Sequence, residues 1–156
     1  MHTIKWKPLI ISLVLSLGVG ALSGFLTSGS MDVYKSLTQP PLSPPAIVFP
    51  IVWTILFLLM GISAYLIYNE NAYDSGKALI LYGVQLLVNF LWPIFFFNMQ
   101  LYWFSFLWIL FLWVLIILMI KEFYKINKTA AYLQIPYLLW VTFAAYLNLA
   151  IALLNK

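Results

Sequence analysis

Three tryptophans inside apolar runs of this sequence lie within four residues of a proline. They are Trp53, Trp92 and Trp140, which accompany the prolines at positions 50, 93 and 136. A buried indole N–H needs a hydrogen-bond acceptor, and a proline inside a helix leaves the carbonyl four positions earlier without its usual donor. Such irregularity is tolerated at membrane depth where a cavity or neighbouring helices satisfy the freed groups. We therefore expect three irregular helices, each carrying a tryptophan.

Helical spacing extends each of these tryptophans into a stripe along one helix face. The stripes are Phe49, Trp53, Phe57 and Met60; Gln85, Asn89, Trp92 and Phe96; and Trp140, Ala144 and Asn148. Carboxamides are costly in hydrocarbon unless they are paired, so two interpretations stay open. Converging stripes would form an aromatic cavity with a few amide anchors, which is the usual composition of a small-molecule site. Alternatively, the amides only hydrogen-bond between helices, which contributes about 0.6 kcal/mol each.

Other reactive side chains are scarce. The chain has no cysteine, its only histidine is His2, and the apolar runs contain no acidic or basic residue. A catalytic triad, a carboxylate pair or a metal site of histidine and cysteine cannot be assembled from these residues. Proton relays and charge-lined ion paths normally need such groups as well. We expect no metal and no cofactor, and conventional acid–base catalysis is excluded as the main function.

The composition of the chain requires lipid as its solvent. Of the 156 residues, 65% are hydrophobic and 8% are charged, and the mean hydropathy is +1.01. Globular chains are roughly 45–50% apolar and about 25% charged. Eight lysines and four acidic residues give a formal net charge of +4. This charge is too sparse for a nucleic-acid partner, so lipid is the expected surrounding.

The apolar runs are long enough to cross a bilayer, which takes about 20 residues per helix. Five spans are expected, at about 8–27, 46–68, 78–99, 101–120 and 129–153. The first run could be misread as a signal peptide, but Ser16, Gly20 and Gly24 recur at every fourth position and indicate a helix-packing face. The expected fold class is an all-α membrane protein, a five-transmembrane-helix bundle that forms a single domain over residues 1–156.

The longest connection, 28–45, contains Pro40, Pro41, Pro44 and Pro45. Proline has a fixed φ and lacks an N–H donor. We therefore expect an ordered but non-helical cover over one end of the bundle, with Pro45 opening the second helix.

The lysines predict how the chain is oriented in the membrane. With five spans, six lysines share one side, and Lys35 and Lys156 share the other. Because cytoplasmic loops carry an excess of lysine and arginine, we expect the N-terminus in the cytoplasm and the cover outside. The expected location is the cell membrane.

Four segments of the sequence match a known family in order and spacing. They are GALSG at 20–24, QPPLSPPAIVFPIVWTILFLLMG at 39–61, QLLVNFLWPIFFF at 85–97 and PYLLWVTFAAYLN at 136–148. Together they resemble the TspO/translocator proteins, also called tryptophan-rich sensory proteins and peripheral-type benzodiazepine receptors. The match extends over nearly the whole chain.

The resemblance implies a five-helix bundle, often a homodimer, that binds porphyrins, sterols and isoquinoline carboxamide or benzodiazepine-type drugs in a cavity capped by the cover. Its implied function is transport or stress sensing. Carried over residue by residue, the implied ligand-binding residues are Tyr34, Pro45, Trp53, Phe57, Asn89, Trp92, Phe96, Trp140, Phe143 and Ala144. The cover departs from the family because it reads PPLSPP where a lysine-proline-aromatic pattern is common. The sterol-recognition pattern of animal members is missing late in the fifth helix.

Two other functions remain open at this point. The resemblance also implies a possible light-dependent breakdown of porphyrin, in which Trp53 and Trp140 would be the catalytic residues. The third possibility is a structural bundle without a ligand. Saturable binding of a porphyrin would distinguish ligand binding and porphyrin breakdown from a structural bundle without a ligand. New absorbing products would distinguish porphyrin breakdown from binding for transport or stress sensing.

Overall fold

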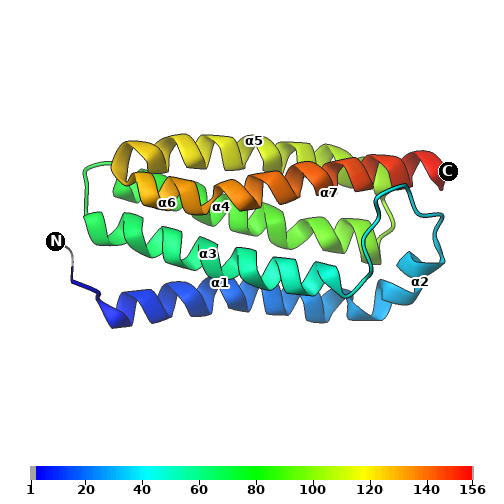
Figure 1. The fold of residues 1–156 in the computed structure, drawn as a ribbon, viewed down its shortest axis with the longest axis horizontal. Coiled ribbons are helices and arrows are strands. Elements are labelled where there is room, and N and C mark those ends of the chain that lie inside the picture. Colours follow the sequence, from blue (N-terminus) through cyan, green and yellow to red (C-terminus); the bar gives the residue numbers. More distant parts are fainter. Residues whose placement is uncertain (1–2, 156) are drawn as a thin grey trace.

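The computed structural model describes residues 3–155, and within that range the chain is helical and contains no strand. In chain order the helices are α1 (Trp6–Thr27), η1 (Ser28–Ser30), α2 (Met31–Ser36), α3 (Val48–Glu70), α4 (Ser75–Pro93), η2 (Ile94–Asn98), α5 (Tyr102–Ile126), α6 (Lys128–Leu133) and α7 (Ile135–Leu154). The long helices run side by side along one axis, and the cover lies at the end that holds the C-terminus (Figure 1).

Five helical segments are long and apolar enough to cross a membrane, which confirms the expected all-α membrane fold. They are Trp6–Ser36, Val48–Glu70, Ser75–Asn98, Tyr102–Ile126 and Lys128–Leu154. Two spans are longer than expected: the first continues through η1 and α2 to Ser36 instead of ending at residue 27, and the fourth continues to Ile126 instead of ending at residue 120. Lys121 and Lys125 are exposed there, and long basic side chains at a helix end can reach the interface.

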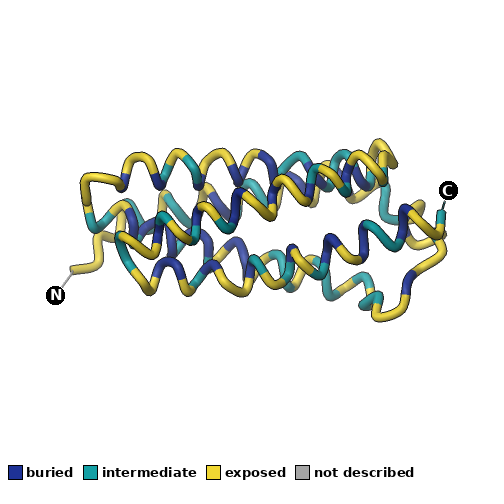
Figure 2. The backbone as a smooth tube through the Cα atoms, turned by 90° about the horizontal axis from the view of Figure 1, so that it is seen from above, coloured by how far each residue is buried: buried dark blue, intermediate teal, exposed yellow. Residues whose placement is uncertain are grey.

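The helices pack around a core of aliphatic and aromatic side chains. α1 packs mainly on α3, α5 packs on α4 and α7, and α6 packs on α3 and α5. Met60, Ile109 and Ile151 are completely buried, and Figure 2 shows buried positions recurring along the helices between exposed ones. The outward faces carry large apolar side chains such as Phe25 and Ile80, which are 75% and 71% exposed. Lipid is the solvent that such a surface favours.

Small residues let α1 approach α3 closely. A Cβ atom on Gly61 would lie 2.6 Å from the Ser16 hydroxyl oxygen and 3.1 Å from the Leu13 Cα atom. A Cβ atom on Gly20 would lie 2.5 Å from the ring of Phe57. Glycine at both positions therefore allows the two helices to touch, as the spacing of Ser16 and Gly20 predicts.

The prediction was wrong for Gly24, the third residue of that packing face. Gly24 is exposed, and a Cβ atom there would meet no atom within 4 Å. At this end α1 instead buries Ser23 and Thr27, and the Ser23 hydroxyl donates a hydrogen bond to the Phe90 carbonyl of α4 at 3.4 Å. Gly24 lies outside the contact because α1 meets α4 through a different face.

The connection 28–45 is partly helical, which corrects the expected non-helical cover. Residues 28–36 form η1 and α2, while all four prolines lie in the remainder. Asp32 in the first turn of α2 and Lys35 in its last turn match the helix dipole. α3 also begins at Val48 and not at Pro45, because the Pro45 carbonyl accepts only a turn hydrogen bond, from the Val48 N–H at 3.0 Å.

Three hydrogen bonds tie the cover to α7 and to Asn155, the residue that follows it. The Thr38 N–H donates to Asn155 Oδ1 at 2.9 Å, and Asn155 Nδ2 donates to the Thr38 carbonyl at 3.0 Å. The Tyr146 hydroxyl donates to the Pro41 carbonyl at 2.8 Å. The cover is therefore attached to the end of the fifth span.

The predicted proline irregularities occur in two of the three helices. Pro93 lies inside α4 and is followed by η2, a π-helical turn. The fifth span is interrupted at Gln134, between α6 and α7 and just before Pro136. The expectation was wrong for Pro50, which lies in the first turn of α3, where the Ala46 carbonyl accepts from the Phe49 N–H at 3.3 Å.

The spans place the lysines as the sequence predicts. Lys5, Lys7, Lys77, Lys121, Lys125 and Lys128 lie at the end of the bundle that is opposite the cover, and Lys35 lies in α2 at the cover end. Lys156 and His2 lie outside the described residues.

Candidate functional site

Rings from α2, α3, α4, η2, α5 and α7 touch one another in the half of the bundle next to the cover. We call them the aromatic cluster: Tyr34, Phe49, Trp53, Phe57, Trp92, Phe96, Phe97, Tyr102, Tyr137, Trp140 and Phe143. The three tryptophan stripes of the sequence therefore converge. Convergence follows from the fold, because α3, α4 and α7 all turn their tryptophan faces toward the same interior.

Trp140 joins the rings of α7 to those of α3. Its ring lies 6.4 Å from Trp53 at an interplanar angle of 87° and 5.9 Å from Phe49 at 66°, measured between centroids. Phe143, one turn further along α7, lies 5.6 Å away. Edge-to-face pairs of this kind are worth about 0.5–1.5 kcal/mol each beyond their buried area. The same ring thus connects α7 to two positions on α3.

A small cavity of about 20 Å³ lies inside the aromatic cluster, beneath the cover. Its lining residues are Tyr34, Phe49, Trp92, Phe96, Phe97, Ala144, Leu147, Asn148 and Ile151. A volume of this size holds about one water molecule, whereas drug-sized ligands occupy pockets of about 300–1,000 Å³. The aromatic rings therefore fill the interior, and a flat ligand would have to displace at least one of them.

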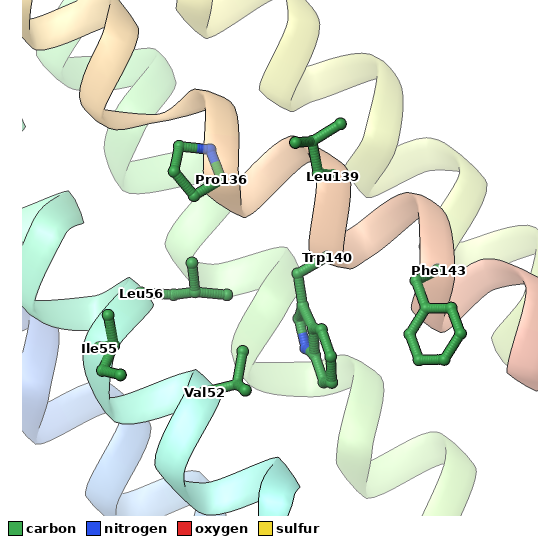
Figure 3. Close-up of a pocket in the computed structure, with 7 residues that line it drawn as sticks. All are labelled: Val52, Ile55, Leu56, Pro136, Leu139, Trp140 and Phe143. Carbon is green, nitrogen blue, oxygen red and sulfur yellow. The ribbon is translucent and has the colours of Figure 1, made fainter. Parts of the chain in front are cut away.

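A larger groove of about 400 Å³ lies between α3 and α7. It is lined by Val52, Ile55, Leu56, Pro136, Leu139, Trp140 and Phe143 (Figure 3). α3 contacts the fifth span mainly through α6 and has few close contacts with α7. Figure 3 shows Trp140 projecting from α7 toward Val52 of α3. Trp140 in the groove lining contacts Phe49 in the lining of the small cavity, so neighbouring rings connect the two.

The amides of α4 bind a tyrosine of α7. Asn89 Nδ2 donates to the Tyr137 hydroxyl at 2.7 Å, and that hydroxyl donates to Gln85 Oε1 at 2.7 Å. All three side chains are buried, and the Tyr137 ring also lies 6.4 Å from Trp53. Tyr137 therefore connects the polar core of the bundle to the aromatic cluster.

The third amide, Asn148, is also paired between helices. Its Oδ1 accepts from Trp92 Nε1 at 3.0 Å, and its Nδ2 donates to the Tyr102 carbonyl at 2.8 Å. The interhelical role that the sequence left open for the amides is therefore present, in addition to the convergence of the aromatic stripes. Only Asn148 also lines the small cavity.

The structure brings together nine of the ten residues that the resemblance nominates for ligand binding. Seven belong to the aromatic cluster, Ala144 lines the small cavity, and Asn89 holds Tyr137. Pro45 is exposed and lines neither the cavity nor the groove. The binding role of these residues stays a prediction.

Tyr137 is the central residue that sequence reasoning missed. Its only signal was its position one residue after Pro136 and three before Trp140, which places it on the face of α7 adjacent to the tryptophan. Phe97, Leu147 and Ile151 of the cavity lining were also missed. They carry no signal because aromatic and aliphatic residues surround them throughout the sequence.

The indole nitrogens of the chain have different environments. Trp92 Nε1 donates to Asn148, Trp108 Nε1 to the Val88 carbonyl at 2.8 Å, and Trp113 Nε1 to the Thr142 hydroxyl at 2.9 Å. Trp140 Nε1 is buried and has no hydrogen-bond partner among the described residues. A buried indole N–H normally finds an acceptor, so this donor is available to a ligand.

Acidic residues and histidine do not gather anywhere in the described part of the chain in a group of three or more that could hold a metal ion. Around the aromatic cluster, the available side-chain chemistry is that of indole and phenyl rings, tyrosine hydroxyls and paired carboxamides. This arrangement can stack against a flat apolar molecule, and it can enclose one only if a ring is displaced.

Comparison with known proteins gives one consistent family. The TspO/MBR family matches residues 11–154 of the chain. A "Tryptophan-rich protein TspO" of Chlorobaculum tepidum is 36% identical over 151 residues, which cover 94% of each chain.

Two more distant relatives have different names. A "Tryptophan-rich sensory protein" of Cereibacter sphaeroides is 31% identical over 147 residues, covering 94% of this chain and 91% of that one. A "Translocator protein" of Ovis aries is 31% identical over 147 residues, covering 92% of this chain and 87% of the sheep protein. The range matched by the family, 11–154, reaches all five spans and contains the positions of the aromatic cluster.

Proposed function

Because this chain belongs to the TspO/MBR family, which supports a membrane sensory or transport role, we propose that it binds a flat hydrophobic ligand of the tetrapyrrole class. The ligand is bound within the bilayer, in the half of the bundle beneath the cover. Binding serves transport or stress sensing. The sensory and translocator names belong to the relatives and are consistent with this role.

The observation that carries the proposal is the convergence of Trp53, Trp92 and Trp140 from three different spans. Their rings and those of the neighbouring phenylalanines form one continuous aromatic cluster beside a groove of about 400 Å³. Aromatic faces prefer offset-stacked or edge-to-face partners, and a tetrapyrrole offers a large flat face. The apolar lining favours a ligand that partitions into lipid.

Titration with protoporphyrin IX, followed by tryptophan fluorescence, tests the proposal. The purified chain in lipid nanodiscs should show saturable quenching, because a bound porphyrin accepts excitation energy from nearby indoles. Replacing Trp108 and Trp113 by phenylalanine serves as a matched control, because both tryptophans lie outside the cavity and groove linings. Quenching that rises linearly with porphyrin concentration, as in nanodiscs that lack this chain, would contradict the proposal. The remaining function would then be that of a structural bundle without a ligand.

A second candidate function is light-dependent breakdown of the bound porphyrin. The contact between Trp53 and Trp140 favours it, because the photoexcited porphyrin can take an electron from one indole and be reduced, and the second indole, 6.4 Å away, can then refill the first. New absorbing products that form only under illumination, and only with the protein present, would support this function.

The proposal includes the orientation and assembly of the chain. We place the N-terminus in the cytoplasm because six lysines lie at that end of the bundle. The location in the cell membrane and the homodimer rest on the resemblance. Protease protection of a tag at each terminus in sealed cells tests the orientation, and the mass of the protein in detergent tests the dimer.

A further inference from the structure

A ligand could reach the small cavity from the aqueous end only by moving the cover. The cover is held at that end by the reciprocal pair of hydrogen bonds between Thr38 and Asn155 and by the bond from Tyr146 to the Pro41 carbonyl. Pro40 is buried, and Tyr34 of α2 packs its ring against Phe96 and Phe97. Access from the water therefore requires several polar contacts and an aromatic contact to break.

The side of the bundle between α3 and α7 offers a different path. The groove there is lined by apolar side chains, and two of them, Ile55 and Leu139, are 51% and 65% exposed. Both helices are membrane spans, so the surface that these side chains expose faces the hydrocarbon of the bilayer. A molecule dissolved in lipid can reach the groove without crossing a polar surface.

Trp140 lies where this groove adjoins the lining of the small cavity. It lines the groove, and its ring contacts Phe49, which lines the cavity. Its indole N–H has no hydrogen-bond partner among the described residues, in contrast to those of Trp92, Trp108 and Trp113. Rotation of the Trp140 ring therefore breaks ring contacts but no hydrogen bond of its nitrogen.

We propose that a flat hydrophobic ligand enters the aromatic cluster sideways from the bilayer, through the groove between α3 and α7, and that the ring of Trp140 is the gate. This inference rests on the proposed function, because it describes how the same ligand reaches the same site. The ligand class is one that partitions into lipid. Filling the mouth of the groove slows both binding and release without changing the affinity, because the mouth lies on the path and outside the bound state, whereas the Trp140 ring belongs to both.

The test measures association of protoporphyrin IX with the full chain in lipid vesicles, from the absorbance change of the porphyrin. Leu139→Trp fills the mouth of the groove, and Leu107→Trp makes the same change at a residue of α5 that is also 65% exposed but lies outside the groove. We expect Leu139→Trp to slow association and release at least tenfold each, and Leu107→Trp to change neither. Trp140→Ala should accelerate association, which tests the gate with a variant that adds no bulk.

Asn155→Ala tests the alternative path, because it removes both hydrogen bonds between Asn155 and Thr38. The association rate should stay within twofold of the wild type. Faster association in Asn155→Ala together with an unchanged rate in Leu139→Trp would overturn the side path in favour of the cover. Slower association in Leu139→Trp with an equal loss of affinity would also overturn the gate, because the groove would then be part of the bound state. Absence of saturable binding by the wild type would overturn the proposed function and this inference together.

Discussion

The indole of Trp53 on α3 meets that of Trp140 on α7 edge-on, with ring centroids 6.4 Å apart and planes at 87°. The two residues are 87 positions apart in the chain, and close helix contacts between α3 and α7 are few. The ring pair is therefore one of the limited contacts that join these helices beside the groove. A ligand that separates the rings would replace their contact by two new aromatic contacts of its own.

The first prediction concerns this pair. Trp53→Phe and Trp140→Phe keep an aromatic face, so the binding free energy of protoporphyrin IX should fall by only about 0.5–1.5 kcal/mol. Light-dependent loss of porphyrin absorbance should be largely abolished if the two indoles act as electron donors, because phenylalanine is much harder to oxidise. Binding is followed by fluorescence titration and breakdown by absorbance under illumination.

The control for this prediction is the pair Trp108→Phe and Trp113→Phe, which should change neither binding nor breakdown. Equal breakdown in all four variants would show that Trp53 and Trp140 form a binding wall without a redox role. The catalytic candidate would then be dropped for this chain.

The second prediction concerns Tyr137. Tyr137→Phe removes the hydroxyl that accepts from Asn89 and donates to Gln85, while the ring stays against Trp53. Two buried amides lose a partner, so the free energy of unfolding should fall by about 1–3 kcal/mol. Thermal unfolding in detergent, monitored by circular dichroism, measures this loss of stability. Tyr73→Phe is the control because Tyr73 is fully exposed; equal stability of the two variants would contradict the role of the hydroxyl.

The third prediction concerns the contact between α1 and α3. In Gly61→Ala the new methyl group would lie 3.1 Å from the Leu13 Cα atom, so the helices must move apart. Overpacking of this kind costs about 1–3 kcal/mol. Gly18→Ala introduces the same methyl group where no atom lies within 4 Å and should leave stability unchanged or slightly raised. Denaturation of both variants in the same detergent compares their stabilities. A Gly61→Ala variant as stable as the wild type would contradict the close contact between α1 and α3.

The fourth prediction concerns iron. Haem is usually held through histidine, cysteine, methionine or tyrosine. Here cysteine is absent, the only histidine is His2, and eight of the eleven rings of the aromatic cluster are indole or phenyl rings. The cluster also contains three tyrosines, of which Tyr137 already uses its hydroxyl to bind Asn89 and Gln85. Stacking should therefore dominate, and metal-free protoporphyrin and haem should bind with comparable affinity in parallel titrations. A preference for haem of roughly a hundredfold or more, about 2.7 kcal/mol, would show that a side chain of this chain binds the iron.

The spans and the converging stripes could be predicted because both follow from local sequence patterns. Apolar runs bounded by charge define the helices. Helical spacing places Trp53, Trp92 and Trp140 each on one face of its own helix, together with the other residues of its stripe. The helical half of the cover was not predictable from its prolines, since Met31–Ser36 contains none and is stabilised by its own charges and by Tyr34 packing against other helices.

The rest of the candidate site depends on how the helices pack. Tyr137 becomes central only because α4 brings Gln85 and Asn89 to its hydroxyl. Pro45 and Gly24 fit their local patterns but lie outside the contacts that those patterns suggested, because neighbouring helices meet the chain at other faces. The groove arises from the limited contact between α3 and α7, which no stretch of sequence encodes by itself.

The central claim is that a flat hydrophobic ligand binds at the aromatic cluster of Trp53 and Trp140. The most direct test is an experimental structure of the chain with protoporphyrin IX bound in a lipid environment. We predict that the macrocycle lies beneath the cover, in contact with both indoles, and that the Trp140 ring is displaced from its position against Phe49. A macrocycle bound only on the outer, lipid-facing surface of the helices, with the ring pair of Trp53 and Trp140 intact, would contradict the claim.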